Sequence, residues 1–336
     1  MDMKKTKFSV GALFSGIGGI EKGFKDAGYS IEWANEFDAN ACKTYRLNNK
    51  NTHLIEGDLL EIDPGSLNPV DILVGGFPCQ AFSVAGYQKG FDDPRGNLFF
   101  AITRMIKKLP EKPKAFMLEN VKNLVGHDKG KTFKVIRKEL EKLGYSFFWK
   151  VLNTSDYTDI PQNRERTIMV GFRDELDWEF NPNAIASQVF DQHFPPPKVN
   201  KLHHIREFLE KEKVDEKFYY RENAYMYNEL VKSVISTDTV YQWRRVYVRE
   251  NKSDMCPTLT ANMGTGGHNV PLIKDKWGIR KLTPRECFRF QGFSDIELPD
   301  DVAQSQLYKQ AGNSVTVPLM KAVALQIKKA LQEKYL

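Results

Sequence analysis

The first half of the chain alternates short apolar runs with segments of helical periodicity, and this alternation constrains the fold most. The expected strands are the apolar runs at residues 8–14, 31–35, 53–56, 71–75, 115–118, 145–152 and 167–172. Helical periodicity marks residues 20–27, 97–109 and 132–143. Near-continuous apolar runs indicate strands buried on both faces, and their alternation with helices is typical of α/β folds. The sequence therefore predicts a doubly wound, Rossmann-like α/β sheet.

Polar side chains follow four of these runs. Glu36, Asp58, Cys79 and Glu119 each come just past the expected carboxyl end of a strand. In open α/β sheets, ligands bind in the crevice outside these strand ends. Four such residues in succession predict a functional site at this edge.

A glycine turn and an acid suggest a nucleoside cofactor. Gly16, Gly18 and Gly19 follow the first expected strand, and Glu36 lies 20 residues after Gly16, where an acid binds ribose hydroxyls in Rossmann-like sites. The glycines do not complete the G-x-G-x-x-G pattern that cradles a pyrophosphate, so the pattern favours S-adenosylmethionine over NAD. We interpret Asp58 as an acceptor for the adenine amino group, although a plain surface-loop aspartate is the simpler interpretation of that residue by itself.

Cys79 is the candidate nucleophile. Most lone cysteines are small buried hydrophobic residues, but Cys79 follows Pro78 at the expected crevice edge and precedes the polar Gln80 and Ser83 in a glycine-containing loop. A nearby cation lowers the pKa of a thiol and makes it a strong nucleophile. The candidate cations come from another expected strand and are Arg164 and Arg166.

Composition sets only broad limits. The 336 residues suggest about two domains, and a proline-rich change near Phe180 places a boundary there. With 49 Lys and Arg against 43 Asp and Glu, the net charge of +6 permits an anionic partner without requiring one. No apolar run approaches the roughly 20 residues of a membrane span. The other three cysteines lack C-x-x-C spacing, which argues against a disulfide framework or zinc site and favours a reducing cytoplasm: Cys42, Cys256 and Cys287.

Taken together, the motifs resemble those of the C5-cytosine DNA methyltransferases, in particular the small bacterial enzymes of restriction–modification systems. The matching stretches occur in the family's order over nearly the whole chain: LFSGIGG (13–19), ANEFD (34–38), GD (57–58), GGFPCQAFS (75–83), FDDPRGNLFF (91–100), ENVKN (119–123), QNRER (162–166), PRECFRFQGF (284–293) and AGNSV (311–315). The resemblance implies a Rossmann-like methyltransferase domain over 1–181, completed by the C-terminal helix in 310–336. It implies a smaller target-recognition domain and hinge over 182–309.

The resemblance also implies a mechanism. Cys79 attacks C6 of cytosine, while Glu119 hydrogen-bonds N3 and the exocyclic amine and offsets the charge that builds on the ring. Arg166 holds the base at O2, with Arg164 beside it. The activated C5 accepts the methyl group of S-adenosylmethionine, leaving S-adenosylhomocysteine, and loss of the C5 proton with elimination of Cys79 releases the product. The base must leave the duplex to reach the thiol.

The same resemblance implies the cofactor contacts and the partners. The expected cofactor-binding residues are Phe14, Gly16, Ile17, Gly19, Glu36, Asp58, Leu59, Pro78, Leu98, Asn313 and Val315. The expected partner is double-stranded DNA, bound by a monomer without a metal or a membrane, in the bacterial cytoplasm with the nucleoid. Many relatives carry serine where this chain has Ala85.

Target recognition is expected within residues 182–275. The segment 241–249 interleaves aromatic residues with arginines, as in a DNA-facing surface, and is equally consistent with a half-exposed strand. The segment 258–269 is a glycine-rich loop whose backbone can approach a groove closely. The expected DNA-binding residues are Gln80, Ser83, Arg244, Arg245, Thr258, Thr260, Gly264, Gly266 and Gly267. We interpret His203 and His204 as solvated surface and not as metal ligands.

Three alternatives to a DNA methyltransferase stay open at this point. A relative within the family methylates tRNA, but the separate basic and aromatic region favours DNA. A catalytically silent DNA-binding relative is disfavoured by the intact Cys79, Glu119 and Arg166. An NAD-dependent oxidoreductase is disfavoured by the shortened glycine motif and the candidate thiol.

Overall fold

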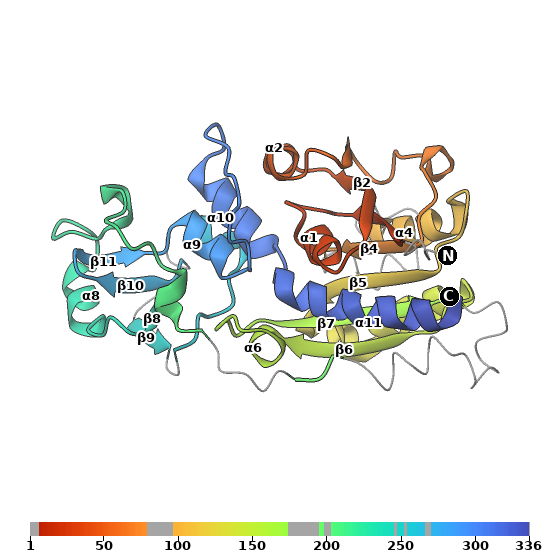
Figure 1. Ribbon diagram of the computed structural model, residues 1–336. Helices are drawn as coiled ribbons and strands as arrows, with labels where there is room; N and C mark the ends of the chain where they lie inside the picture. The colour runs from red at the N-terminus through yellow and green to blue at the C-terminus, as the bar shows by residue number, and fades with distance from the viewer. Residues whose placement is uncertain are drawn as a thin grey trace, which may run out of the picture. The chain divides into compact units, whose positions relative to one another are not determined.

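The computed structural model describes residues 7–78, 97–173, 195–197, 203–244, 247–251, 254–265 and 270–335. The chain divides into two compact units (Figure 1). The first unit comprises residues 1–152, 165–196 and 319–336, and the second comprises 153–164 and 197–318.

The first unit contains a seven-stranded sheet in the order β3-β2-β1-β4-β5-β7-β6. Its strands are β1 Ser9–Leu13, β2 Ser30–Glu36, β3 His53–Glu56, β4 Ile72–Gly76, β5 Ala115–Val121, β6 Phe148–Asn153 and β7 Glu165–Phe172. The pairs from β3 to β5 are parallel, as expected of a doubly wound sheet, while β7 runs antiparallel to β5. The reversal of β7 places the start of that strand beside the carboxyl end of β5.

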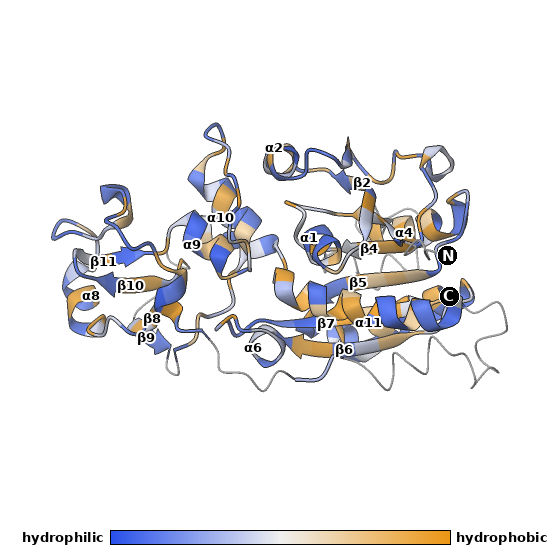
Figure 2. Ribbon diagram, viewed as in Figure 1, coloured by the Kyte–Doolittle hydropathy of each residue, from blue (hydrophilic) through white to orange (hydrophobic). Residues whose placement is uncertain are grey.

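Helices cover both faces of this sheet (Figure 1). They are α1 Gly19–Asp26, α2 Ala39–Asn48, α4 Asn97–Lys108, α5 Lys131–Lys142 and α11 Val317–Tyr335. α4 and α5 bury apolar side chains such as Ile102 and Ile136 against the sheet residues Leu73 and Phe116. The apolar stripes on these helices and the strongly apolar β5 stand out in Figure 2. α11 packs on α1, where a side chain on Gly23 would collide with Met320.

The second unit contains a four-stranded antiparallel sheet in the order β11-β10-β8-β9. Its strands are β8 Val240–Arg244, β9 Tyr247–Asn251, β10 Leu272–Asp275 and β11 Gly278–Lys281, and its helices are α6 Thr154–Tyr157, α8 Tyr227–Ser233, α9 Pro284–Arg289 and α10 Gln304–Asn313. The apolar cluster under this sheet includes Leu230, Tyr241, Trp243, Leu272 and Ile279.

The expected strands and helices recur within a few residues, with two differences near the site. Glu36 and Glu119 lie inside the final residues of β2 and β5 and not past their ends. The unit limits also differ from the expected 1–181 and 182–309. Residues 153–164 belong to the second unit because their backbone bonds to Cys256, whose N–H donates to Pro161 O at 2.7 Å and whose carbonyl accepts from Asn163 N at 2.9 Å. Residues 310–318 belong to it as well.

Candidate active site

The glycine turn at the end of β1 adopts the conformation that its sequence requires. Gly16 and Gly18 have φ values of 56° and 89°, and Phe14 shares this left-handed region at 53°. The turn is closed by two backbone bonds, from Ser15 N to Asn35 O at 2.9 Å and from Gly18 N to Ser15 O at 2.8 Å. Open space surrounds the position where Gly16 would carry a side chain. The turn therefore presents backbone to a ligand and not side chains.

The carboxylate of Glu36 is fixed against this turn. One oxygen accepts from Gly16 N at 2.6 Å, and the other accepts from Phe37 N at 2.8 Å and Asp38 N at 2.7 Å. A carboxylate has about four acceptor sites, so three backbone bonds leave room for one more donor. Oriented in this way, Glu36 fits a ribose hydroxyl beside the open Gly16, which meets the requirement for a nucleoside cofactor.

Asn35 and Arg104 hold the turn after β3, which carries Asp58 and Leu59. The sequence did not predict this role for either residue. The buried Asn35 donates to Ile55 O at 3.0 Å and to Gly57 O at 2.9 Å. Arg104 of α4 donates to the carbonyls of three residues in the following turn, at 2.7, 3.0 and 3.1 Å: Leu59, Leu60 and Ile62. An arginine on an amphipathic helix is normally interpreted as solvated surface, so the sequence carries no signal of this role.

Asp58 bonds its own turn, with one carboxylate oxygen accepting from Leu60 N at 2.9 Å. The expected contact of Asp58 with an adenine amine stays a prediction. Of the remaining expected cofactor residues in the first unit, Ile17 and Leu59 are buried, Leu98 is half-buried and Pro78 is exposed, and Gly19 begins α1.

Asn120 holds the chain that leads into the candidate nucleophile. The side chain of Asn120 is 2% exposed, and its Nδ2 donates to Phe77 O at 2.8 Å. Its Oδ1 accepts from Val121 N at 2.8 Å. The backbone two residues before Cys79 is therefore tied to the end of β5. Cys79 itself lies outside the described residues, as do the expected DNA contacts Gln80 and Ser83 and the neighbouring Ala85.

Glu119 and Arg166 form an ion pair at the same edge. Arg166 Nε lies 2.8 Å from Glu119 Oε1, and the two side chains are only 13% and 11% exposed. The antiparallel register places Arg166 opposite Val121, so Arg166 and Glu119 are diagonal neighbours on one face. A side chain on Gly76 would lie 3.1 Å from Glu119 Oε2, so the glycine leaves that oxygen accessible. An acid that accepts hydrogen bonds beside a fixed guanidinium suits recognition of a polar, planar base.

The structure corrects the catalytic assignment of Arg164. This side chain is 1% exposed, and its guanidinium donates to Leu259 O at 2.7 Å, to Gly312 O at 3.0 Å and to Ser314 O. All three carbonyls belong to the second unit, as does Arg164. The guanidinium is occupied by backbone, so Arg164 joins three segments of the second unit and does not contact a substrate.

Two glutamines extend this buried polar network. Gln162 donates to Phe290 O at 2.6 Å, and Gln291 donates to Ala311 O at 2.8 Å. These side chains come from the QNRER and FRFQGF motifs, whose polar residues the sequence marked without indicating a role. The expected cofactor residues Asn313 and Val315 lie beside this network in the second unit, the first exposed and the second buried.

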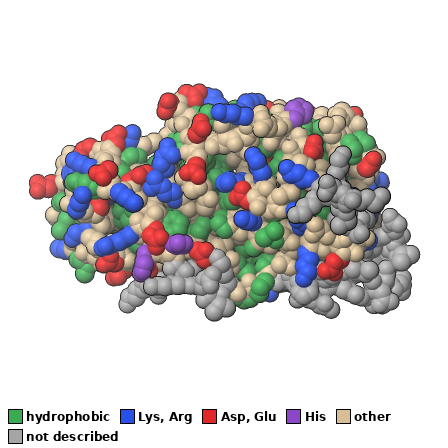
Figure 3. All heavy atoms as spheres, viewed as in Figure 1, with side chains coloured by type: hydrophobic (Ala, Val, Ile, Leu, Met, Phe, Trp, Pro, Cys, Tyr) green, Lys and Arg blue, Asp and Glu red, His purple; other side chains and the backbone are tan. Residues whose placement is uncertain are grey.

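The expected recognition segment forms the hairpin β8–β9. Tyr241 and Trp243 face the apolar cluster, so Gln242 and Arg244 face the other side. Residues that lie directly opposite each other in the hairpin share a face. Arg249 is opposite Gln242 and Tyr247 is opposite Arg244, so both lie on this second face. Figure 3 shows arginine and lysine side chains mixed with acidic ones over the part that Figure 1 labels β8 to β11. The segment is thus a half-exposed strand that carries two arginines and a glutamine on its open face.

The glycine-rich segment is only partly described, because Gly266 and Gly267 lie outside the described residues, as does Arg245 of the segment 241–249. Thr258 donates to Asn163 O at 2.5 Å, and Thr260 donates to Asn262 Oδ1 at 2.8 Å. A side chain on Gly264 would lie 2.8 Å from Tyr308 Cβ. Close packing on α10 therefore explains this glycine without a DNA groove.

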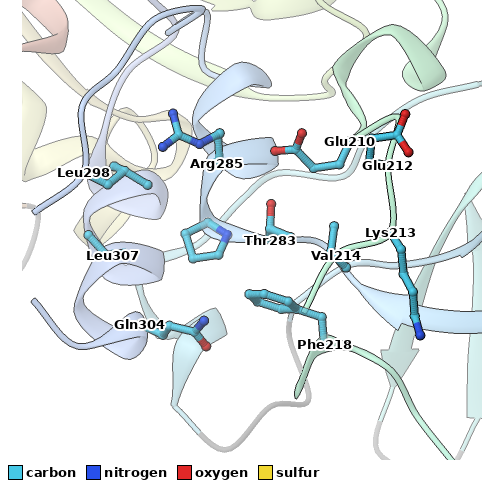
Figure 4. A pocket seen from close by; sticks show the side chains of 11 residues that line it. Glu210, Glu212, Lys213, Val214, Phe218, Thr283, Arg285, Leu298, Gln304 and Leu307 are labelled. Carbon is cyan, nitrogen blue, oxygen red and sulfur yellow. The ribbon is translucent and has the colours of Figure 1, made fainter. Parts of the chain in front are cut away.

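The second unit also contains a pocket of about 370 Å³, lined by side chains around Thr283 (Figure 4). Glu210 and Glu212 face it together with Arg285, so both signs of charge border the cavity. None of the site residues predicted from the sequence lines it.

The histidines each pair with one acid, His203 with Glu207 at 2.7 Å and His204 with Asp254 at 2.6 Å. Within the described part of the chain, no group of three potential metal ligands occurs. No helix among the described residues is long and apolar enough to cross a membrane.

The three described cysteines are poor nucleophiles. Each is buried and free of a disulfide. Burial raises the pKa of the Cys42 thiol to about 12, and burial also raises the pKa of Cys256 and of Cys287 above the ordinary value. At neutral pH these thiols stay protonated, so Cys79 is the remaining candidate for a reactive thiolate.

Comparisons with known proteins identify the family. A family model described as C-5 cytosine-specific DNA methylase matches residues 8–329. Type II methyltransferase M.Bsp6I of Bacillus sp. (strain RFL6) is 50% identical over 327 residues, which cover 96% of this chain and 99% of the relative. Type II methyltransferase M.SsoII of Shigella sonnei is 39% identical over 322 residues, covering 94% and 78%. The solved S. pombe Dnmt2 methyltransferase shares the fold, with a TM-score of 0.70, 19% identity and coverage of 98% and 100%.

Proposed function

Because the chain belongs to the C-5 cytosine-specific DNA methylase family, we propose that it transfers a methyl group from S-adenosylmethionine to C5 of cytosine within a short duplex DNA sequence. The Glu119–Arg166 pair carries this proposal, since it sets an acceptor and a fixed guanidinium beside the backbone that leads to Cys79. The type II names of the relatives support a protecting role in a restriction–modification system.

The cofactor fits the edge formed by β1 and β2. Gly16 would border it, Glu36 would accept from a ribose hydroxyl, and the turn at Asp58 and Leu59 would lie at the base. Pro78 and Leu98 complete this set in the first unit, and Asn313 and Val315 stay expected contacts from the second. When bound, S-adenosylmethionine supplies an electrophilic methyl group.

The protein's own groups prepare the base. The Cys79 thiolate adds to C6 of a flipped-out cytosine, and the π electron pair of the C5=C6 double bond shifts toward C5 and N3. Glu119, held by Arg166, would accept from the exocyclic amine, and a proton shared between Glu119 and N3 would stabilise that charge. Arg166 also holds O2. After methylation a base takes the C5 proton, the C5=C6 double bond re-forms, and the C6–S bond breaks to release the Cys79 thiolate.

Labelled S-adenosylmethionine tests the proposal with duplex DNA and with tRNA as alternative acceptors. We expect label in DNA, and bisulfite sequencing of that DNA gives the recognised sequence. Label in tRNA alone would contradict the proposal and favour an RNA methyltransferase.

A second test concerns the covalent step. Cys79→Ala should abolish transfer, whereas the matched variant Cys42→Ala, which removes a buried thiol from α2, should keep it. Duplex DNA that contains 5-fluorocytosine should form a stable adduct with the wild-type chain, because fluorine cannot leave C5 as a proton does. An active protein that forms no adduct would exclude attack by Cys79.

DNA contact by the open face of β8–β9 is testable by salt dependence. Removing a cation that contacts a phosphate lowers affinity for all sequences and reduces the slope of log affinity against log salt by about one. Removing a base contact costs about 1–3 kcal/mol for the recognised sequence alone. Arg244→Ala and Arg249→Ala should each show one of these patterns, and unchanged binding in both variants would remove this face from the DNA interface.

A further inference from the structure

A cluster of three polar side chains lies buried beneath the glycine turn. Ser15 belongs to the turn, Glu21 to the first turn of α1 and Tyr45 to α2, and their exposed fractions are 8%, 2% and 0%. Among the described residues, neither oxygen of Glu21 nor either hydroxyl has a hydrogen bond of good geometry, although the two hydroxyls lie near enough to Glu21, and Thr52 near enough to Tyr45, to interact weakly. Buried polar groups are ordinarily paired, because leaving one unpaired costs about 1–3 kcal/mol. This concentration of unpaired groups at one turn therefore requires a physical explanation.

The cluster is in contact with the turn from the inside. A side chain on Gly18 would lie 3.0 Å from the Tyr45 ring, so the turn packs directly on Tyr45. On its outer side the same turn is held by Glu36, which accepts from Gly16 N at 2.6 Å. Ser15 and Tyr45 therefore connect Glu21 to the turn.

Burial is the main influence on the protonation of Glu21. It raises the pKa of this carboxyl from 4.5 to about 7, and the Glu36 carboxylate at the end of β2 raises it further. The nearby hydroxyls of Ser15 and Tyr45 lower the pKa but do not offset burial. Glu21 therefore changes charge close to neutral pH.

We propose that Glu21 is a positioning residue whose protonated carboxyl group donates a hydrogen bond within the cluster and holds the glycine turn in its cofactor-binding shape. Ionisation leaves a buried charge next to a second carboxylate, and such a charge rearranges its surroundings or admits water. The turn then loosens and binds the cofactor more weakly. The inference rests on the proposed binding of S-adenosylmethionine at this turn.

Hydrogen exchange of the cofactor-free, full-length protein tests the turn directly. Wild type is compared with Glu21→Gln, which mimics the protonated carboxyl group, and with Glu32→Gln, a matched change at an exposed glutamate of β2. After correction for the intrinsic effect of pH, peptides that cover the turn should lose protection between pH 6 and pH 8 in wild type and in Glu32→Gln. Protection should stay constant in Glu21→Gln. Equal behaviour of wild type and Glu21→Gln would overturn the inference.

Calorimetric titration with S-adenosylmethionine gives the second readout. A group with a pKa near 7 reduces the binding-competent fraction about tenfold between pH 6 and pH 8. Wild-type affinity should fall by about that factor relative to Glu21→Gln, and this ratio cancels the titration of the amino group of the cofactor. Equal pH dependence in the two proteins would also overturn the inference. If no variant binds the cofactor while turn protection changes as expected, the proposed cofactor is wrong and the role of Glu21 in the turn stands.

Tyr45→Phe keeps the test decisive if Glu21→Gln does not fold. The Tyr45 hydroxyl lowers the pKa of Glu21, so its removal should move the midpoint of the protection change to higher pH. An unchanged midpoint would contradict the cluster.

Discussion

Replacing Asn120 by alanine should separate the placement of the nucleophile from the stability of the sheet. In the folded protein, Asn120 Nδ2 donates to Phe77 O at 2.8 Å, two residues before Cys79 in the sequence. Both Asn120 and Phe77 are at most 3% exposed. The variant leaves a buried carbonyl without its side-chain donor, which should lower the free energy of unfolding by about 1–3 kcal/mol.

The expected kinetic effect exceeds that change in stability. A displacement of about 1 Å at a reacting group can cost on the order of 100-fold in rate. Asn120→Ala should therefore lower kcat by one to two orders of magnitude and leave the affinity for S-adenosylmethionine unchanged. Single-turnover methylation and cofactor titration, both at a temperature where the variant is folded, measure the two quantities.

Tyr145→Phe is the matched control. Its hydroxyl also donates to a buried backbone carbonyl, Pro113 O at 2.6 Å, just before β5 begins and so away from the strand end that carries Glu119. The control should lose similar stability and keep its kcat. The reasoning is refuted if both variants lose kcat equally, or if Asn120→Ala turns over at the wild-type rate.

Three further predictions concern stability and thiol chemistry. Glu286→Gln breaks the ion pair in which Arg280, 1% exposed, donates to Glu286, 0% exposed, at 2.7 and 2.8 Å. The variant should lose about 3 kcal/mol or more of unfolding free energy in urea. A loss below about 1 kcal/mol would contradict a buried charge pair. The folded-state pKa of Glu21 lies above its unfolded value, so its stabilising effect is full below pH 4.5 and disappears as the pH rises through about 7. Denaturation across this range should show wild type losing about 3 kcal/mol relative to Glu21→Gln, and parallel curves would exclude the titration. A small alkylating reagent at pH 8 should label the native chain only at Cys79, and peptide mapping would show the labelled position. Rapid labelling of Cys42, Cys256 or Cys287 would contradict the burial of these three thiols.

The local sequence pattern was sufficient to predict the structure of a segment where the environment of that segment follows from its own residues. The apolar run at 71–75 predicted β4 within one residue, because a strand buried on both faces has few alternatives. The glycines predicted the turn after β1, because left-handed backbone at Gly16 and Gly18 favours glycine. The fold class followed from the repetition of such local signals.

The local sequence pattern did not predict the role of a side chain whose hydrogen-bond partners come from distant segments. Arg164 and Arg166 lie two residues apart in one motif, and the sequence predicted that both lie beside the base. The guanidinium of Arg164 bonds to backbone 95 to 150 residues away, whereas Arg166 meets Glu119 across the β5–β7 ladder. The difference depends on where the chain passes between units and on the reversed direction of β7, neither of which leaves a periodic signal.

The sequence by itself determined the sheet, the glycine turn and the family, because each depends on residue types at fixed spacing, and it singled out Cys79 as the candidate nucleophile. Only the tertiary structure decided which arginine pairs with Glu119, that Asn120 holds the backbone after β4 and Arg104 the turn after β3, and that Glu21 is buried. Burial and the direction of long-range hydrogen bonds set those roles, and both arise only when distant segments pack together.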